Sequence, residues 1–136
     1  MAESRQTITT FLTFFGRAEE AMTLYTSLFD NSRVLSIQRW GPNEAGTEGN
    51  VMHATFALNG QQFMCSDSPP VHDWTFTPAI SLYVGCRSEA EIGRLYEGLS
   101  QGGLVFMPLA AYPFSEKFAW VADRYGVSWQ LALEGE

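Results

Sequence analysis

The stretch Thr7–Asp30, TITTFLTFFGRAEEAMTLYTSLFD, changes its hydrophobic period part-way along, and this change decides the fold. Thr7–Phe15 is rich in β-branched and aromatic residues, which predicts a strand. Gly16 interrupts the pattern, and apolar residues then recur at spacings of three and four across Arg17–Asp30. That spacing predicts a helix with one apolar face. The chain therefore opens with a strand followed by a helix.

Three further strands complete a βαβββ unit. One strand is predicted over Arg33–Trp40, and two more are predicted over Val51–Leu58 and Gln61–Asp67. The last two are joined at Asn59 and Gly60, which form the strongest short hairpin signal known. We therefore expect these two strands to pair with each other.

The second half of the chain repeats this order. A proline-containing segment, 68–78, precedes a predicted strand over Ala79–Cys86. Ser88 and Glu91 then form a capping box at the start of a second amphipathic helix. The remaining strands are predicted over Leu104–Tyr112, Lys117–Asp123 and Ser128–Leu133.

The two halves also match weakly in sequence. Tyr25 aligns with Tyr96 and Phe63 aligns with Trp129, which indicates a duplication. A length of 136 residues suits one domain. We predict a single α+β domain built from two tandem βαβββ modules. Module one covers 7–67, the linker 68–78 and module two 79–134.

Charge and hydropathy narrow the partners. Fifteen acidic residues against eight basic ones give a net charge of −7, so a nucleic-acid backbone would be repelled. No apolar run reaches the roughly 18 residues of a membrane-spanning helix. The first residues, MAESRQTITTF, contain no apolar stretch that could act as a secretion signal. We therefore expect a cytoplasmic protein with no nucleic-acid or membrane partner.

The cysteines and the aromatic residues give two further expectations. Cys65 and Cys86 lie in apolar, strand-like segments without a CxxC motif, which favours two buried free thiols. Aromatic residues make up 14% of the chain, more than a core of this size requires. We therefore expect some of the rings to line a pocket.

Three segments carry a resemblance to a known family: FFGRAEEAMTLYTSLF (Phe14–Phe29), HATFALNGQQFMCSD (His53–Asp67) and WVADRYGVSWQL (Trp120–Leu131). In this order they resemble the PhnB-like group of the vicinal oxygen chelate superfamily, which includes glyoxalase I, extradiol dioxygenases and bleomycin-binding proteins. The resemblance implies a homodimer, and a curved, cup-like sheet with its helices on the outer face and a ligand inside the cup.

Members of this group are often labelled as demethylubiquinone methyltransferases, and the residues do not favour that activity. A site for a methyl-donor nucleotide normally needs a glycine-rich turn between a first strand and a helix. The glycine-rich segment Gly41–Asn50 instead lies between two predicted strands. We therefore do not predict a methyltransferase.

The resemblance also implies positions for metal ligands on the first and last strands of each module. Here they fall on Thr10 and Met64 in module one, and on Ala79 or Ser81 and Gln130 in module two. Transition metals need imidazole, carboxylate or thiolate donors, and this set has none. We therefore expect no metal and no other cofactor. Thr10, Met64, Ser81 and Gln130 are instead predicted to contact a ligand.

Three more residues are candidates for the site. His53 shares a strand face with Thr55, opposite the apolar face of Ala54 and Phe56, and this first face is expected to look into the cup. His53 is either a general base or ligand donor, or a histidine hydrogen-bonded to a neighbouring strand. Trp40 and Tyr83 either wall an apolar pocket or belong to the core or a dimer interface.

Three functions stay open. The leading hypothesis is a metal-free, dimeric binding protein that holds a small apolar or aromatic molecule in its cup. The alternative is a metal-dependent lyase, isomerase or dioxygenase acting on a small oxygenated substrate, with His53, Gln130 and Asp67 in a non-standard site. The third is a non-catalytic module whose dimer interface fills the cup.

Overall fold

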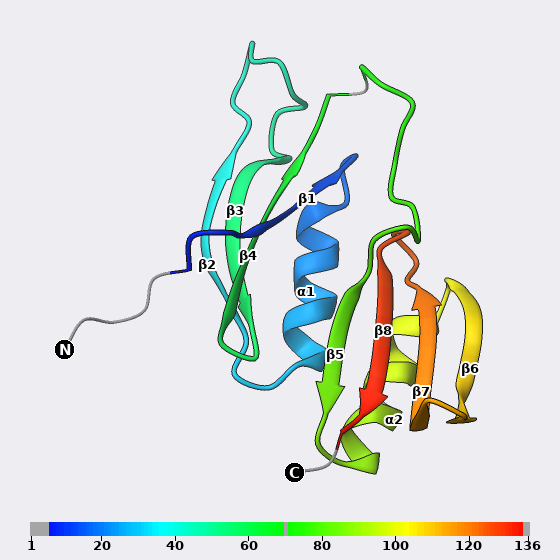
Figure 1. Cartoon of the computed structure of the whole chain (residues 1–136). Helices are drawn as coiled ribbons and strands as arrows, with labels where there is room; N and C mark the ends of the chain where they lie inside the picture. Colours follow the sequence, from blue (N-terminus) through cyan, green and yellow to red (C-terminus); the bar gives the residue numbers. More distant parts are fainter. Residues whose placement is uncertain (1–5, 70, 135–136) are drawn as a thin grey trace, which may run out of the picture. The chain divides into compact units, whose positions relative to one another are not determined.

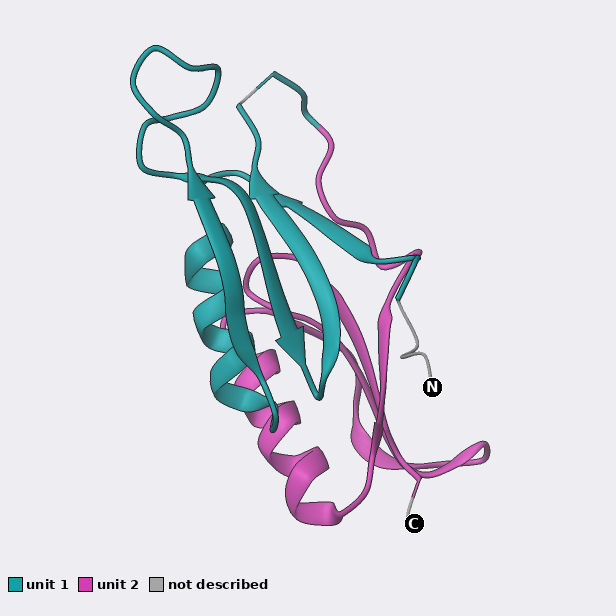
Figure 2. Ribbon diagram, turned by 90° about the vertical axis from the view of Figure 1, so that its left-hand side faces the viewer, with its two compact units in different colours: residues 1–73 teal, residues 74–136 magenta. Residues whose placement is uncertain are grey.

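The computed structural model describes residues 6–69 and 71–134. The chain divides into two compact units, residues 1–73 and 74–136, shown in two colours in Figure 2. The boundary lies within the proline-containing segment 68–78. We call the two parts unit one and unit two.

Unit one is a four-stranded sheet with a helix on one face (Figure 1). Its strands run in the order β1-β4-β3-β2, with β1 parallel to β4 and the other pairs antiparallel. The apolar stripe of the helix packs on the sheet through Tyr25, whose ring centroid lies 6.4 Å from that of Phe56. The described elements are β1 (Thr10–Phe14), α1 (Ala18–Leu28), β2 (Arg33–Arg39), β3 (Val51–Leu58) and β4 (Gln61–Asp67).

Unit two repeats this architecture. Its strand order is β5-β8-β7-β6, with β5 parallel to β8, and α2 packs on β7 and β8. The two repeated units confirm the predicted α+β class of tandem βαβββ modules. The described elements are β5 (Leu82–Cys86), α2 (Glu89–Ser100), β6 (Leu104–Tyr112), β7 (Ser115–Ala122) and β8 (Ser128–Leu133).

The predicted hairpin turn and the predicted capping box are both present in the structure. Asn59 and Gly60 both have positive φ angles, 52° and 82°, as the tight turn of the β3–β4 hairpin requires. The Glu91 N–H donates to Ser88 Oγ at 3.1 Å, and Glu91 Oε1 accepts from the Arg87 N–H at 2.8 Å. This reciprocal pair fixes the start of α2.

Two predicted strands begin later than the sequence indicates. The strand predicted from Thr7 begins at Thr10, because the Gln6 side chain bonds both backbone groups of Gln62 where an extended β1 would pair. The strand predicted from Ala79 begins at Leu82, where its pairing with β8 begins at Trp129. Strand ends therefore depend on the partner strand, which local pattern does not contain.

A buried carboxylate joins three parts of unit one. Asp67 is 3% exposed at the end of β4. Its Oδ1 accepts from the N–H groups of Gly16 and Ala18 at 2.7 and 3.0 Å, and its Oδ2 accepts from the Val51 N–H at 3.0 Å. It thereby caps α1 from a distant strand and ties that helix to β3.

A second buried carboxylate, that of Asp123, accepts three hydrogen bonds in unit two. Asp123 Oδ1 accepts from the backbone N–H groups of Tyr125 and Val127, and its Oδ2 accepts from the Trp129 indole N–H at 2.9 Å. The turn between β7 and β8 and the largest buried ring of the unit are held by one side chain.

Candidate functional site

A row of four side chains crosses the sheet of unit two, one from each strand. In the strand register Tyr83 lies beside Gln130, Gln130 beside Trp120, and Trp120 beside Met107. Their neighbours along β8, Trp129 and Leu131, are buried beneath α2, so the row lies on the opposite, open face.

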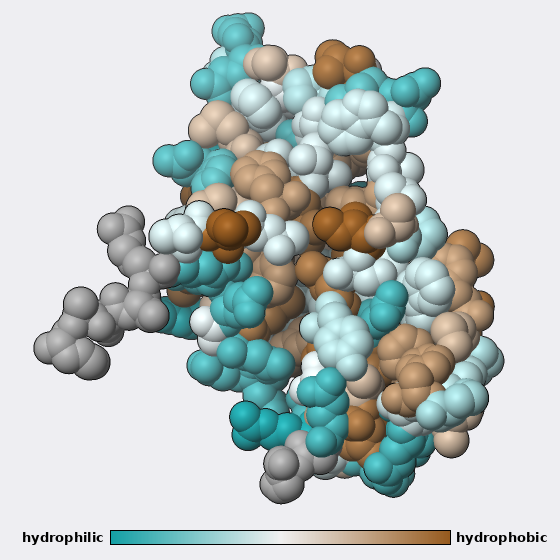
Figure 3. Space-filling view, viewed as in Figure 1, coloured by the Kyte–Doolittle hydropathy of each residue, from teal (hydrophilic) through white to brown (hydrophobic). Residues whose placement is uncertain are grey.

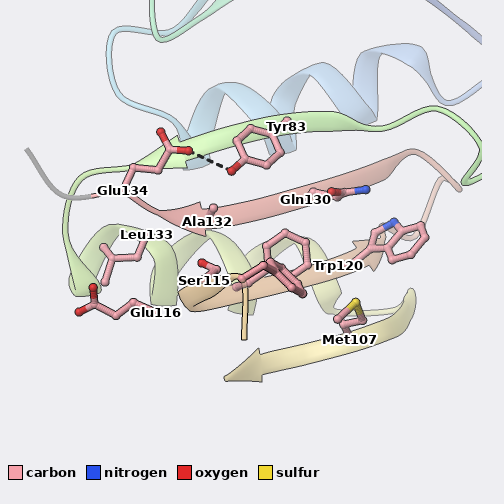
Figure 4. A pocket seen from close by; sticks show the side chains of 11 residues that line it. Tyr83, Met107, Ser115, Glu116, Trp120, Gln130, Ala132, Leu133 and Glu134 are labelled. Atoms are coloured by element: carbon pink, nitrogen blue, oxygen red, sulfur yellow. Dashed lines mark hydrogen bonds between the residues drawn. The ribbon is translucent and has the colours of Figure 1, made fainter. Parts of the chain in front are cut away.

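This row forms the floor of a groove of about 550 Å³ (Figure 4). We call it the groove of unit two. Phe118 and Phe114 add two more rings, packed edge to face with their centroids 5.0 Å apart. Figure 3 shows apolar and weakly polar side chains gathered over β6 to β8, with hydrophilic ones beside them. The residues lining the groove are Tyr83, Met107, Phe114, Ser115, Glu116, Phe118, Trp120, Gln130, Ala132, Leu133 and Glu134.

Side-chain hydrogen bonds fix the polar groups of Trp120 and Gln130, the two middle members of the row. The Trp120 indole N–H donates to Ser128 Oγ at 2.9 Å, and the Ser128 and Ser81 hydroxyls lie 2.6 Å apart. The Gln130 amide N–H donates to Ser81 Oγ at 3.4 Å. These bonds hold the ring of Trp120 and the amide of Gln130 in set orientations over the sheet.

Two carboxylates lie at one end of the groove. Figure 4 shows Glu116 and Glu134 at the end away from Met107 and Trp120. The Tyr83 hydroxyl donates to Glu134 Oε2 at 2.9 Å. Desolvation raises the pKa of the Tyr83 phenol, and the hydrogen bond to Glu134 and the charge of that carboxylate raise it further. Tyr83 therefore stays protonated and keeps Glu134 in place.

The equivalent row of unit one carries different side chains. Phe11 lies beside Met64, Met64 beside Thr55, and Thr55 beside Ser36. Met64 and Gln130 thus occupy matching positions in the two sheets, as the aligned sequence predicts.

His53 lies on the same open face of unit one. It is half-buried, its ring centroid lies 5.8 Å from that of Phe11, and its strand neighbour is Gln38 on β2. The buried neighbours Ala54 and Phe56 confirm the predicted division of this strand into two faces. Whether His53 contacts a ligand stays a prediction.

Thr10 lies on the wrong face to join Met64. It pairs with Phe63, whose buried ring stacks on Phe56 beneath α1. The sequence alignment is one residue out at this strand, and a shift of one residue reverses the face of a side chain. Phe11 instead stands beside Met64 on the open face. Ser81 in unit two does lie on the open face, within contact of Gln130.

Trp40 packs against the loop that follows it. Its indole N–H donates to the Asp67 carbonyl at 3.0 Å, and its ring lies so close to Gly46 that an added Cβ would come within 2.2 Å of it. The backbone of Trp40 also exchanges hydrogen bonds with Gly49 and Asn50. Trp40 therefore organises the segment between β2 and β3, and its predicted contact with a ligand stays a prediction.

The side chains at the metal-ligand positions of the superfamily do not suit a divalent metal. Met64, Ser81 and Gln130 offer a thioether, a hydroxyl and an amide, which are weak donors for zinc, nickel or iron, and Phe11, which stands beside Met64 in place of Thr10, offers none. Within residues 6–69 and 71–134, no group of three or more His, Cys, Asp and Glu side chains is arranged to hold a metal ion.

Only Tyr83 and Gln130 among the groove residues were sequence candidates, and nine others were not: Met107, Phe114, Ser115, Glu116, Phe118, Trp120, Ala132, Leu133 and Glu134. One signal was available, because Phe118 and Trp120 alternate on the predicted strand and must share a face. The other residues come from β6, the β6–β7 turn, the start of β7 and the end of β8, and their approach depends on the register of the strands.

The chain has the fold of a glyoxalase/bleomycin resistance/dioxygenase domain. It matches such a domain from Frankia sp. EAN1pec with a TM-score of 0.68 at 17% identity, covering 99% of this chain and 100% of that one. No helix in the described part of the chain is long and apolar enough to cross a membrane.

The chain belongs to the 3-demethylubiquinone-9 3-methyltransferase family, whose model matches residues 6–132. It is 60% identical to the PhnB protein from Bacillus cereus, with a TM-score of 0.93 over 95% of this chain and 100% of that one. Protein PA1353 from Pseudomonas aeruginosa is 28% identical, with a TM-score of 0.85 over 97% and 100% of the two chains. A search of curated proteins gives no match.

Proposed function

We propose that this protein binds a small apolar or aromatic molecule in the groove of unit two, without a metal. One observation carries the proposal: the groove has the volume of a small-molecule site and is lined by aromatic rings. Tyr83 and Phe114 are 59% and 65% exposed. Covering such rings with a ligand removes apolar surface from water, which favours binding.

The polar groups support recognition as well as burial. Gln130 lies in the middle of the ring-lined floor, and its amide is oriented by Ser81. A few fixed polar groups in an apolar site are what orient a ligand and select it. A molecule with one or two polar atoms on an aromatic or aliphatic body therefore suits the groove best.

The methyltransferase activity in the family's name is not part of this proposal. A methyl-donor nucleotide normally binds at the helix N-terminus that follows the first strand of a doubly wound parallel sheet. In this chain the N-terminus of α1 is capped by Asp67 from β4, and the glycine-rich segment 41–50 connects β2 to β3. Neither feature supports a nucleotide site.

Asp67 is also a poor candidate for catalysis. Its two oxygens accept three backbone hydrogen bonds, and the residue is buried. We therefore assign Asp67 a structural role. The homodimer implied by the family resemblance is kept as a proposal, and native mass spectrometry of the full chain tests it.

A saturation-transfer NMR titration with 1-naphthalenemethanol, a neutral aromatic probe, tests the binding function. We expect saturable binding that is lost in Trp120→Ala, with Trp74→Ala as the matched control, because Trp74 is exposed and outside the groove. Tyr83→Leu serves as a second groove variant if Trp120→Ala does not fold. Non-saturable binding, or equal loss in the Trp74 variant, would contradict the proposal.

A further inference from the structure

Hydrogen-bond donors in the groove are already paired within the protein. The Tyr83 hydroxyl donates to Glu134, the Trp120 indole N–H to Ser128, and the Ser115 hydroxyl to the Lys117 carbonyl at 3.0 Å. The side-chain amide of Gln130 gives one N–H to Ser81 and keeps the other. One amide N–H is therefore the main side-chain donor left for a ligand among the described lining residues.

Acceptors, by contrast, are abundant. Glu116 and Glu134 have four carboxylate oxygens between them, and one of these accepts the Tyr83 hydroxyl. Gln130 adds a carbonyl oxygen, because its N–H faces Ser81. A ligand that pairs with this set must bring its own hydrogen-bond donors.

The formal charge of the groove lining also restricts which ligands suit the groove. Two of the lining residues, Glu116 and Glu134, are acidic and none is basic. Lys117 follows Glu116 in sequence, but its ammonium pairs with Glu89 of α2, 2.9 Å away. The chain as a whole carries −7. An anionic ligand would therefore be repelled and a cationic one attracted.

The groove is also polarised along its length. Glu116 and Glu134 lie at one end and Met107 and Trp120 at the other (Figure 4). A ligand with charge and apolar surface at opposite ends matches this arrangement. The rings can additionally stabilise a cation placed above their faces.

We propose that the ligand of this groove carries a protonated amine on an aromatic or aliphatic body. The amine lies between Glu116 and Glu134, and the body covers the rings of Phe118 and Trp120. This inference rests on the proposed binding function and adds the charge and the orientation of the ligand.

Three probes that share one ring system test the preferred charge of the ligand: the cation of 1-naphthylmethylamine, the neutral 1-naphthalenemethanol and the anion 1-naphthaleneacetate. Their dissociation constants are measured by NMR titration with the full chain at low and at high salt. We expect the amine to bind more tightly than the alcohol and the alcohol more tightly than the acetate. Added salt should narrow these differences, because ions screen partly exposed charges.

Charge-removal variants locate the effect. Glu134→Gln and Glu116→Gln should each lower the ratio of amine to alcohol affinity by about two- to five-fold, as for exposed ion pairs. Glu97→Gln removes one charge from α2, outside the groove, and should leave the ratio unchanged. Because the ratio is measured within one variant, a loss of folded protein affects both probes equally.

The outcomes separate the two proposals. Equal binding of all three probes, or tighter binding of the acetate, would overturn the charge inference and leave the binding function standing. An unchanged ratio in both groove variants would also overturn it. Absence of binding by every probe would overturn both proposals.

Discussion

The two units share one backbone plan and differ in what their open faces present. At matching positions, unit one carries Phe11, Met64 and Thr55, and unit two carries Tyr83, Gln130 and Trp120. The described groove lies on unit two alone. A repeated βαβββ scaffold therefore fixes where a site can form, and a few side chains on one face decide what that site binds.

The buried faces show the reverse pattern. Each unit packs the buried apolar face of its helix on its sheet, and each uses one buried aspartate to accept hydrogen bonds from three N–H groups. The scaffold is thus similar in both units, while the open faces differ.

The buried aspartates should give the largest effect. Asp67→Ala and Asp123→Ala each leave three N–H groups without an acceptor, so each should lower the free energy of unfolding by about 3 kcal/mol or more. Urea denaturation measures this, with exposed Asp73→Ala as the control expected to change little. A loss below about 1 kcal/mol in either variant would show that the two units are not held in the same way.

Replacing an open-face residue of unit two with its counterpart from unit one should weaken ligand binding. Trp120→Thr gives unit two the side chain that unit one has at Thr55, and it should weaken binding of 1-naphthalenemethanol about ten-fold or more. The reciprocal Thr55→Trp is the control, and it should leave that affinity unchanged. Equal weakening by both would contradict the assignment of the site to unit two.

The two cysteines report on each unit separately. Burial raises the pKa of the Cys65 thiol in unit one and of the Cys86 thiol in unit two to about 12, with smaller contributions from Asp67 and Glu91 respectively. Neither thiol should react with a thiol-specific reagent at pH 8 unless its unit opens, since the thiolate is the reactive form.

The raised thiol pKa values also set a pH dependence. The unfolded thiols lose their protons from about pH 9, whereas the folded thiols hold theirs up to about pH 12. The contribution of the two thiols to the free energy of unfolding is therefore fully present below about pH 9, and it is lost as the pH rises from about 9 to about 12. Urea titrations at pH 8 and pH 10 test this, and the double variant Cys65→Ala with Cys86→Ala should flatten the slope. An equal alkaline slope in that variant would assign the loss to other groups.

A glycine in α2 gives the smallest expected change. Gly93 lies inside the helix, and a Cβ at this position would meet no atom within 4 Å, whereas α1 contains no glycine. Gly93→Ala should therefore raise the free energy of unfolding by about 0.5–1 kcal/mol. As the contrasting control, Gly103→Ala would place a Cβ 2.0 Å from the Ala122 carbonyl oxygen and should destabilise strongly. Destabilisation by Gly93→Ala would mean that the helix is packed more closely than the contacts indicate.

Much of the fold follows from local pattern. The helices, the β3–β4 hairpin and the capping box of α2 were all predicted, because each depends on residues a few positions apart. The limits of β1 and β5 were not, because they depend on the side chain of Gln6 and on the pairing of β5 with β8. Local sequence pattern therefore does not predict the ends of a strand that are set by contacts with distant residues.

The site was predicted only in part for the same reason. Gln130 and Ser81 were identified from the family resemblance and Tyr83 as an aromatic residue that could wall a pocket, and the structure brings the three onto one face. Thr10 was placed one residue out of register, which reverses its face. Glu116 and Glu134, which give the groove its charge, lie near strand ends and have no periodic signal.

Chemical-shift mapping of the full chain with 1-naphthylmethylamine tests most directly that the site belongs to the open face of unit two. We predict shifts of the Trp120 indole N–H and of backbone amides in β5, β7 and β8, with the amides of β1, β3 and β4 unchanged. Shifts confined to residues 10–67, around Phe11, His53 and Met64, would contradict the account and move the site to unit one.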